Sequence, residues 1–221
     1  MEEINIITLG DSAVGKTSLI NRITDKTFSD EHQVTVGFDF KYITRDYNKS
    51  FKSIKYYFWD TAGEENFNSL AEIYIRGKEI VLLVFSDLKT LNSLKKRWIE
   101  FYKQHADSEN SKIIVVANKS DTFGDKYEEI RKLGKEFSMT INSFFIICSA
   151  KSKENIDNLE DHIELEAIRL IESRNIIEKR NSLTLKPIKN NKKNTSNVKT
   201  ENSHKQTNVN INTKITNKVC C

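Results

Sequence analysis

The stretch Gly10-Asp11-Ser12-Ala13-Val14-Gly15-Lys16-Thr17 directly follows an apolar run at residues 4–9 and matches the phosphate-loop pattern G-x-x-x-x-G-K-[ST]. Glycines let a backbone curl around an anion, and the amide groups of such a loop face nucleotide phosphates together with the positive end of the following helix. Lys16 adds a positive charge, and the Thr17 hydroxyl can bind Mg²⁺. The strand-loop-helix context therefore predicts a phosphate-binding loop rather than an ordinary glycine-bearing turn.

Short apolar runs rich in β-branched or aromatic residues recur along the chain, separated by longer polar stretches with helical spacing. The four runs cover residues 4–9, 80–85, 113–117 and 144–148. Their continuous apolar character predicts strands that are buried on both faces of a sheet. Residues 38–42 and 54–58 alternate in character instead, which predicts an antiparallel hairpin at the edge of that sheet.

Apolar stripes at helical spacing fill the gaps between these strands. One stripe covers residues 91–102, and another predicts a last helix from about Lys153 to Arg174. Alternating strands and helices predict a single α/β domain with a six-stranded, mostly parallel sheet, one antiparallel edge hairpin and flanking helices. We assign this domain to residues 1–178.

The composition favours one globular domain in a reducing compartment. The chain has 221 residues, 38% of them apolar, and its longest unbroken apolar run covers only residues 80–85. A membrane-spanning helix needs about 20 such residues, so we expect none, and the acidic N-terminus argues against a signal peptide. Two of the three cysteines, Cys220 and Cys221, are adjacent at the C-terminus, unlike the spaced framework of a secreted disulfide scaffold.

Residues 179–221 are predicted to form a disordered basic tail. From residue 181 onward the tail holds eight lysines against one acidic residue, Glu201, and ten asparagines. It contains no aromatic residue, so it cannot bury enough apolar surface to repay the entropy lost on ordering. Nucleic-acid binding is disfavoured because the lysines are mostly single and no aromatic side chains are interleaved to stack on bases.

Two further segments follow the phosphate loop in the order and spacing seen in Ras-like small GTPases, which the chain resembles. Residues 34–40 (VTVGFDF) resemble the first switch, in which the Thr35 hydroxyl would join Mg²⁺ while the γ-phosphate is present. Residues 59–65 (WDTAGEE) resemble the second switch, in which Asp60 would hold Mg²⁺ through a water and the Gly63 amide would sense the γ-phosphate. The resemblance implies GTP or GDP and Mg²⁺ as ligands. The expected metal ligands are Thr17, Thr35 and Asp60.

Asn118-Lys119-Ser120-Asp121, after the apolar run at residues 113–117, determines which base is expected. A carboxylate at Asp121 can accept hydrogen bonds from N1–H and the 2-amino group of guanine, and adenine has neither donor there. Each such tetrapeptide taken alone could be an ordinary polar loop. In this order the segments extend the resemblance over about residues 3–175.

Ser149-Ala150-Lys151 completes the base subsite of the family, with the Ala150 amide at guanine O6 and Lys151 over the ring. Phe28 stands where the family places an aromatic side chain edge-on to guanine, and the alternative is a loop phenylalanine that caps the core. Together, the motif and the resemblance assign nucleotide binding to Gly10, Asp11, Ser12, Ala13, Val14, Gly15, Lys16, Thr17, Ser18, Phe28, Thr35, Gly63, Asn118, Lys119, Asp121, Ser149, Ala150 and Lys151.

Several residues resemble Rab proteins rather than other branches. Phe40, Trp59 and Tyr74 occupy the positions of the aromatic triad that Rab effectors contact, and Cys220-Cys221 is the double-cysteine ending that carries two geranylgeranyl groups. The resemblance implies exchange factors, GTPase-activating proteins, effectors, and prenyl-escort and dissociation-inhibitor proteins as partners. It also implies a place on the cytoplasmic face of intracellular membranes, with a cytosolic pool, and a task in vesicle traffic.

Glu64 is the largest departure from the family pattern, because nearly all active relatives carry a glutamine that orients the attacking water. The expected catalytic residues are Glu64, Lys16 and Thr35. Two interpretations stay open: a switch with an altered hydrolysis rate, or a hydrolysis-deficient scaffold that stays GTP-bound. A nucleotide kinase on the same phosphate loop is disfavoured by the guanine motif and by the absence of a lid insertion in the sequence.

Overall fold

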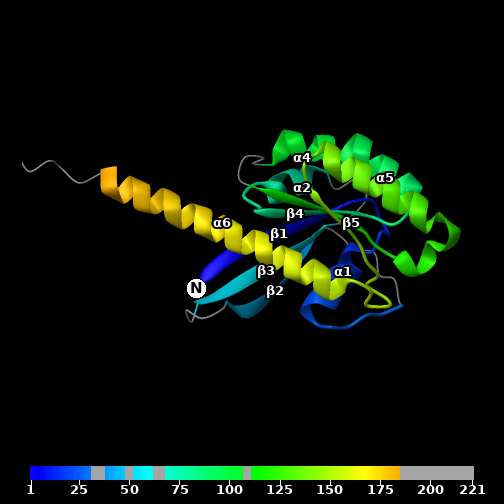
Figure 1. Ribbon diagram of the computed structural model, residues 1–221, viewed down its shortest axis with the longest axis horizontal. Helices are drawn as coiled ribbons and strands as arrows, with labels where there is room; N and C mark the ends of the chain where they lie inside the picture. Colours follow the sequence, from blue (N-terminus) through cyan, green and yellow to red (C-terminus); the bar gives the residue numbers. More distant parts are fainter. Residues whose placement is uncertain (31–37, 48–51, 62–67, 107–110, 185–221) are drawn as a thin grey trace, which may run out of the picture. The chain divides into compact units, whose positions relative to one another are not determined.

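The computed structural model describes residues 1–30, 38–47, 52–61, 68–106 and 111–184 (Figure 1). Within them, the strands are β1 (Glu2–Leu9), β2 (Phe38–Tyr47), β3 (Lys52–Thr61), β4 (Ile80–Phe85), β5 (Lys112–Ala117) and β6 (Phe144–Ile147). The helices are α1 (Lys16–Thr24), α2 (Asn68–Ile75), α3 (Leu88–Ser93), the π-helical turn η2 (Leu94–Trp98), α4 (Ile99–His105), the 3₁₀ turns η3 (Ser120–Thr122) and η4 (Gly124–Lys126), α5 (Tyr127–Thr140) and α6 (Ile156–Thr184).

The six strands form one sheet in the order β2-β3-β1-β4-β5-β6. Only β2 and β3 pair antiparallel, with Phe40 opposite Trp59 and Tyr42 opposite Tyr57. The other neighbours are parallel, as the alternation of apolar runs and helical stripes predicted. The predicted six-stranded α/β sheet with an antiparallel edge hairpin is confirmed.

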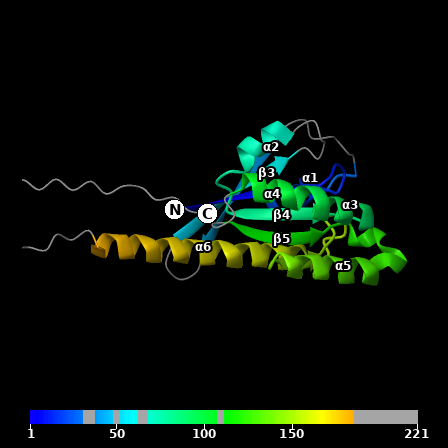
Figure 2. The same cartoon turned by 90° about the horizontal axis from the view of Figure 1, so that it is seen from above.

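Two separate cores lie on the two faces of the sheet. Alternate residues of β4, such as Leu82 and Leu83, enter opposite cores, which is why every residue of this strand is buried. One core is completed by α1 and α6, and the other by α2, α3, η2, α4 and α5. Figure 1 shows α4 and α5 above the strands and α1 and α6 below or in front of them, and Figure 2 looks down from the α4 side, so that α4 overlies β4. The continuous apolar runs therefore reflect burial between two layers of helices.

The last helix differs from the prediction at both ends. It begins at Ile156 rather than near Lys153, because Lys153 and Asn155 have positive φ angles of 69° and 54° that no right-handed helix contains. It continues beyond Arg174 to Thr184, since no glycine or proline interrupts this stretch. In the described part of the chain, no helix is long and apolar enough to cross a membrane.

The predicted helical stripe at residues 91–102 is also more irregular than expected. It is divided among α3, η2 and α4, and Leu94–Trp98 forms a π-helical turn. Such turns are rare and frequently lie at functional sites. Here the turn contains Trp98, whose side chain is 2% exposed and reaches the phosphate loop, as described below.

Candidate nucleotide-binding site

The phosphate loop joins the end of β1 to the start of α1. Gly10 and Gly15 have φ angles of 151° and 89°, which favour glycine. A Cβ atom on Gly10 would overlap the carbonyl oxygen of Val84, and one on Gly15 would overlap the side-chain amide of Asn118. Glycine is therefore required at both positions, because neighbouring atoms leave no room for a side chain and because the backbone has a positive φ angle.

Lys16 lies inside the curve of this loop. Its Nζ donates hydrogen bonds to the carbonyl oxygens of Gly10 and Asp11, both at 2.9 Å. Burial lowers the pKa of Lys16 to about 8, while the carboxylates of Asp60 and Asp11 act in the opposite direction. The ammonium group is thus held where an incoming phosphate oxygen could replace one of the two carbonyl acceptors.

Two of the three expected metal ligands meet beside the loop. Thr17, at the start of α1, donates from Oγ1 to Oδ2 of Asp60 at 2.6 Å. Asp60 lies near the end of β3 and is 4% exposed. A hydroxyl and a carboxylate are oxygen ligands of the kind that Mg²⁺ prefers alongside phosphate oxygens, so the residues present fit this ion. The third expected ligand, Thr35, lies outside the described residues.

A cavity of about 310 Å³ opens next to the phosphate loop, where a base would lie. Ala13, Gly15 and Ser18 line its phosphate-loop side. The residues predicted to surround the base also line it, namely Phe28, Asn118, Lys119, Asp121, Ala150 and Lys151. A larger hollow of about 730 Å³ between α4 and α6 holds none of these residues, so size alone does not identify the site.

Asn118 ties the two halves of the site together. Its Nδ2 donates to the Val14 carbonyl at 2.9 Å, and its Oδ1 accepts from the Ala150 amide at 3.1 Å. Asn118 therefore connects the phosphate loop to the loop after β6. The resemblance also implies a contact between the Ala150 amide and guanine O6. That contact would have to share the amide with Asn118 or displace it.

Further contacts orient the base subsite. The Ser149 hydroxyl donates to Oδ1 of Asp121, which fixes the direction of this carboxylate at the cavity wall. At the rim, Lys151 Nζ lies 2.8 Å from Oδ1 of Asp30. Asp30 was not predicted, because it belongs to no motif. Only its position beside the cavity identifies it.

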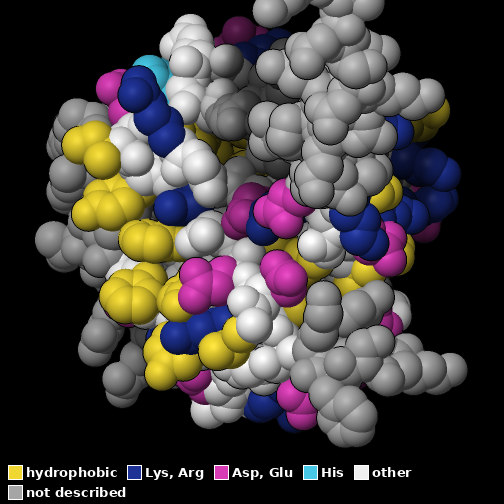
Figure 3. All heavy atoms as spheres, turned by 90° about the vertical axis from the view of Figure 1, so that its left-hand side faces the viewer, with side chains coloured by type: hydrophobic (Ala, Val, Ile, Leu, Met, Phe, Trp, Pro, Cys, Tyr) yellow, Lys and Arg dark blue, Asp and Glu magenta, His cyan; other side chains and the backbone are white. Residues whose placement is uncertain are grey.

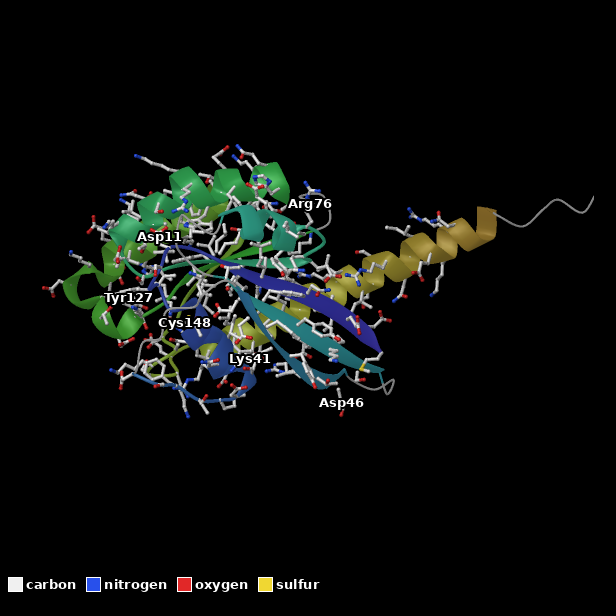
Figure 4. All side chains as sticks on the ribbon, turned by 180° about the vertical axis from the view of Figure 1, so that it is seen from behind. Asp11, Lys41, Asp46, Arg76, Tyr127 and Cys148 are labelled. Carbon is white, nitrogen blue, oxygen red and sulfur yellow. The ribbon has the colours of Figure 1, made fainter. Side chains whose placement is uncertain are left out.

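Asp11 has a contact that the loop pattern gave no reason to expect. Its Oδ1 accepts from the Ser93 hydroxyl at 2.6 Å and from the Trp98 indole N–H at 2.7 Å. Ser93 lies in α3 and Trp98 in η2, and Figure 4 shows Asp11 between the end of β1 and the helical layer that contains these elements. Asp11 stands at a variable position of the motif, so its partners could be found only in the folded chain.

The predicted aromatic triad lies together on the surface. The ring centroids of Phe40 and Trp59 are 5.7 Å apart, and those of Trp59 and Tyr74 are 5.6 Å apart. Phe40 is 55% exposed, and Lys78 Nζ lies 4.0 Å from the centroid of the Trp59 ring system. Figure 3 shows hydrophobic side chains gathered in a band on one side of the drawn face, with basic side chains beside them. Phe40 is therefore the exposed member of the triad, whereas Trp59 and Tyr74 are partly buried against the core.

Five predicted site residues lie outside the described part of the chain. They are Thr35, Gly63, Glu64, Cys220 and Cys221. Their roles in metal binding, phosphate sensing, catalysis and lipidation stay predictions.

Comparison with known proteins agrees with this geometry. The family model described as "Ras family" matches residues 5–168. "Ras-related protein Rab-12" of Homo sapiens is 37% identical over 160 residues, 71% of this chain and 64% of that protein. "GTP-binding protein ypt1" of Schizosaccharomyces pombe is 33% identical over 154 residues, 69% of this chain and 73% of that protein. "Ras-related protein SEC4" of Candida albicans is 32% identical over 158 residues, 71% of this chain and 73% of that protein. The chain thus spans slightly less than two thirds of the Rab-12 relative.

The contact between Asp11 and Trp98 gives a prediction about stability. Trp98→Phe keeps a ring in the core but removes the donor to a carboxylate, so the free energy of unfolding should fall by about 1.5–3 kcal/mol. Trp59→Phe is the matched control, because the Trp59 indole N–H donates to the neutral amide oxygen of Asn5 and is less buried. Its expected loss is about 0.5–1.5 kcal/mol. Denaturant unfolding followed by circular dichroism measures both, and equal losses would contradict the assignment.

Proposed function

The chain belongs to the Ras family of small GTPases and is most like its Rab members, and we propose that it is a GTP/GDP switch in vesicular membrane trafficking. In this proposal the protein binds guanine nucleotide with Mg²⁺, hydrolyses GTP slowly and recruits effectors in its GTP form. Its useful output is a change of surface shape rather than a released product.

The observation that carries the proposal is the placement of Asp121 on the wall of the cavity beside the phosphate loop. Guanine presents two donors, N1–H and the 2-amino group, toward a carboxylate in this position, and adenine presents neither. The Ser149 hydroxyl occupies one oxygen of Asp121 and orients the group. A carboxylate aimed in this way favours guanine over adenine.

The residues of the phosphate loop perform the binding of the phosphates. Lys16 would exchange its carbonyl acceptors for phosphate oxygens, and Thr17 and Asp60 would hold Mg²⁺, which neutralises phosphate charge when bound. With the γ-phosphate present, Thr35 and Gly63 would be drawn toward it. The surface formed by Phe40, Trp59 and Tyr74 would then be ordered for effectors, and hydrolysis would release it.

Replacement of Asp121 tests guanine recognition. Asp121→Asn should weaken GTP binding by about 1.5–3 kcal/mol, because a hydrogen bond to a charged acceptor is lost. Asp30→Asn is the control, since its carboxylate pairs with Lys151 at an exposed rim where an ion pair contributes only about 0–1 kcal/mol. Titration with labelled GTP measures both affinities, and chromatography identifies the nucleotide released from the purified protein. Equal effects of the two substitutions, or a predominance of adenine nucleotides, would refute guanine recognition.

Glu64 makes a second function possible, that of a hydrolysis-deficient scaffold. A glutamate can accept a hydrogen bond from the attacking water, but it cannot donate toward the transferring phosphoryl group, and in the expected role its charge would lie near an anionic phosphate. We favour a slow but active switch, because Mg²⁺, Lys16 and backbone donors supply most of the electrostatic stabilisation in such sites. GTPase-activating proteins can supply further groups in trans.

Single-turnover hydrolysis of bound GTP distinguishes these two functions. We expect measurable hydrolysis by the unaltered protein and a slower rate for Glu64→Leu, because leucine cannot hold the water. If Glu64→Gln accelerates hydrolysis by about tenfold, which is about 1.4 kcal/mol of barrier, Glu64 slows the native protein and the scaffold function gains support. An unaltered protein that releases no phosphate would support the scaffold instead.

Membrane attachment would depend on Cys220 and Cys221. One lipid chain gives marginal, reversible membrane binding, whereas two chains anchor a protein stably. Lysines near an anionic leaflet add about 1 kcal/mol each within a Debye length of about 8 Å, so Lys214 and Lys218 would contribute most. The partners of this form are prenyl-escort and dissociation-inhibitor proteins, which shield the lipids, together with exchange factors, activating proteins and effectors.

Fractionation of cells that express Cys220→Ser/Cys221→Ser tests this attachment. The double variant should move almost entirely to the soluble fraction. Lys214→Ala/Lys218→Ala should keep most of its membrane share, because both lipid chains remain. Equal membrane shares for the cysteine variant and the unaltered protein would defeat the proposal.

A further inference from the structure

Arg22 is a buried arginine that belongs to none of the motifs described above. It lies in α1, six positions after Lys16, and is only 7% exposed. Its guanidinium donates only to main-chain carbonyl oxygens among the described residues. Nε reaches Ala150 at 2.7 Å, Nη1 reaches Lys26 at 2.8 Å, and Nη2 makes a longer contact of 3.4 Å to Lys151.

These carbonyls belong to two segments that line the base cavity from different parts of the chain. Ala150 and Lys151 come from the loop after β6, and Lys26 comes from the segment after α1 that leads to Phe28. The guanidinium carbon also lies 5.7 Å from the centroid of the Phe28 ring, within the range of a cation–π contact. One side chain therefore contacts both walls of the cavity.

The chemistry of arginine suits this position. A guanidinium is planar and presents its donors in a fixed fork, so it can hold several carbonyl oxygens at defined distances from one another. A lysine ammonium is a compact point charge on a flexible stem and cannot reproduce that geometry. The identity of the residue as arginine, rather than its charge alone, should thus determine the spacing of the two loops.

We propose that Arg22 is a positioning residue for the guanine subsite. By holding the carbonyls of Lys26 and Ala150, it sets the width of the slot between Phe28 and the loop at residues 149–151. Arg22 acts through these groups rather than by touching the base. Because α1 also begins at the phosphate loop, the same helix aligns the base subsite with the phosphate subsite. This inference rests on the guanine-nucleotide binding proposed above.

A second arginine provides a matched control. Arg174, on α6, pairs with the carboxylate of Glu79 and contacts the main-chain carbonyl of Glu3, and its side chain is 40% exposed. None of these three residues lines the base cavity. Arg174→Lys therefore removes a guanidinium fork from the same domain without changing a contact of the residues around the base.

The test measures how fast a fluorescent GDP analogue leaves the full-length protein in excess Mg²⁺ and unlabelled GDP. Arg22→Lys should accelerate dissociation by about tenfold or more, as expected for the loss of one or two hydrogen bonds that position the loops. Arg174→Lys should change the rate by less than about twofold. Arg22→Gln, which also lacks the fork, replaces Arg22→Lys if that variant does not fold.

A double-variant cycle separates positioning from general loosening of the structure. If Arg22 acts through Phe28 and its neighbours, Arg22→Lys/Phe28→Leu should dissociate GDP more slowly than the product of the two single effects predicts. A purely multiplicative result, or an equal acceleration by Arg174→Lys, would overturn the proposal. If Arg22→Lys binds GDP and releases it at an unchanged dissociation rate, this inference alone is overturned. A protein that binds no guanine nucleotide would overturn the proposed function with it.

Discussion

The hydrogen bonds of one buried amide, Asn118, are the constraint on which the rest of the site depends. Asn118 is 1% exposed at the end of β5, where its own backbone amide donates to the Phe85 carbonyl at 2.8 Å. Its side chain donates to the phosphate loop at Val14 and accepts from Ala150. A side-chain amide donates from its nitrogen and accepts at its oxygen, so this one residue can bind both partners at once. The same side chain occupies the space that a Cβ on Gly15 would need.

This arrangement is possible because parallel strands end at one edge of the sheet. β1 lies between β3 and β4, and the helices that follow β1 and β4 enter opposite cores. Where the helices after two neighbouring parallel strands pack on opposite faces of a sheet, a crevice opens between the ends of those strands, and ligands bind there in open α/β sheets. The phosphate loop lies at this crevice, and Gly10 packs against the carbonyl of Val84. The strand order therefore brings the sequence-distant motifs into one site.

Local sequence patterns predicted most of the fold and the motif residues, and what they missed depends on long-range contacts. Strands and motifs were visible because their signals lie within a few adjacent residues. The π-helical turn at Leu94–Trp98 was not visible, because its apolar spacing also fits a regular helix. The contact of Trp98 with Asp11 was not visible either, because these two residues lie 87 positions apart. Arg22 was missed for the same reason: its acceptors at Ala150 and Lys151 are brought near only by folding. The start of α6 was misplaced because left-handed backbone at Asn155 has no clear local signal.

In the proposed switch, the hydrogen bonds of Asn118 make the phosphate and base subsites act as one guanine-nucleotide site. The rate at which GDP leaves Asn118→Ala, compared with the unaltered protein at saturating Mg²⁺, tests this role. Alanine would leave the Val14 carbonyl and the Ala150 amide without their shared partner, so GDP should dissociate faster by about 10- to 100-fold. An unchanged dissociation rate in a correctly folded Asn118→Ala protein would show that the two subsites do not depend on Asn118.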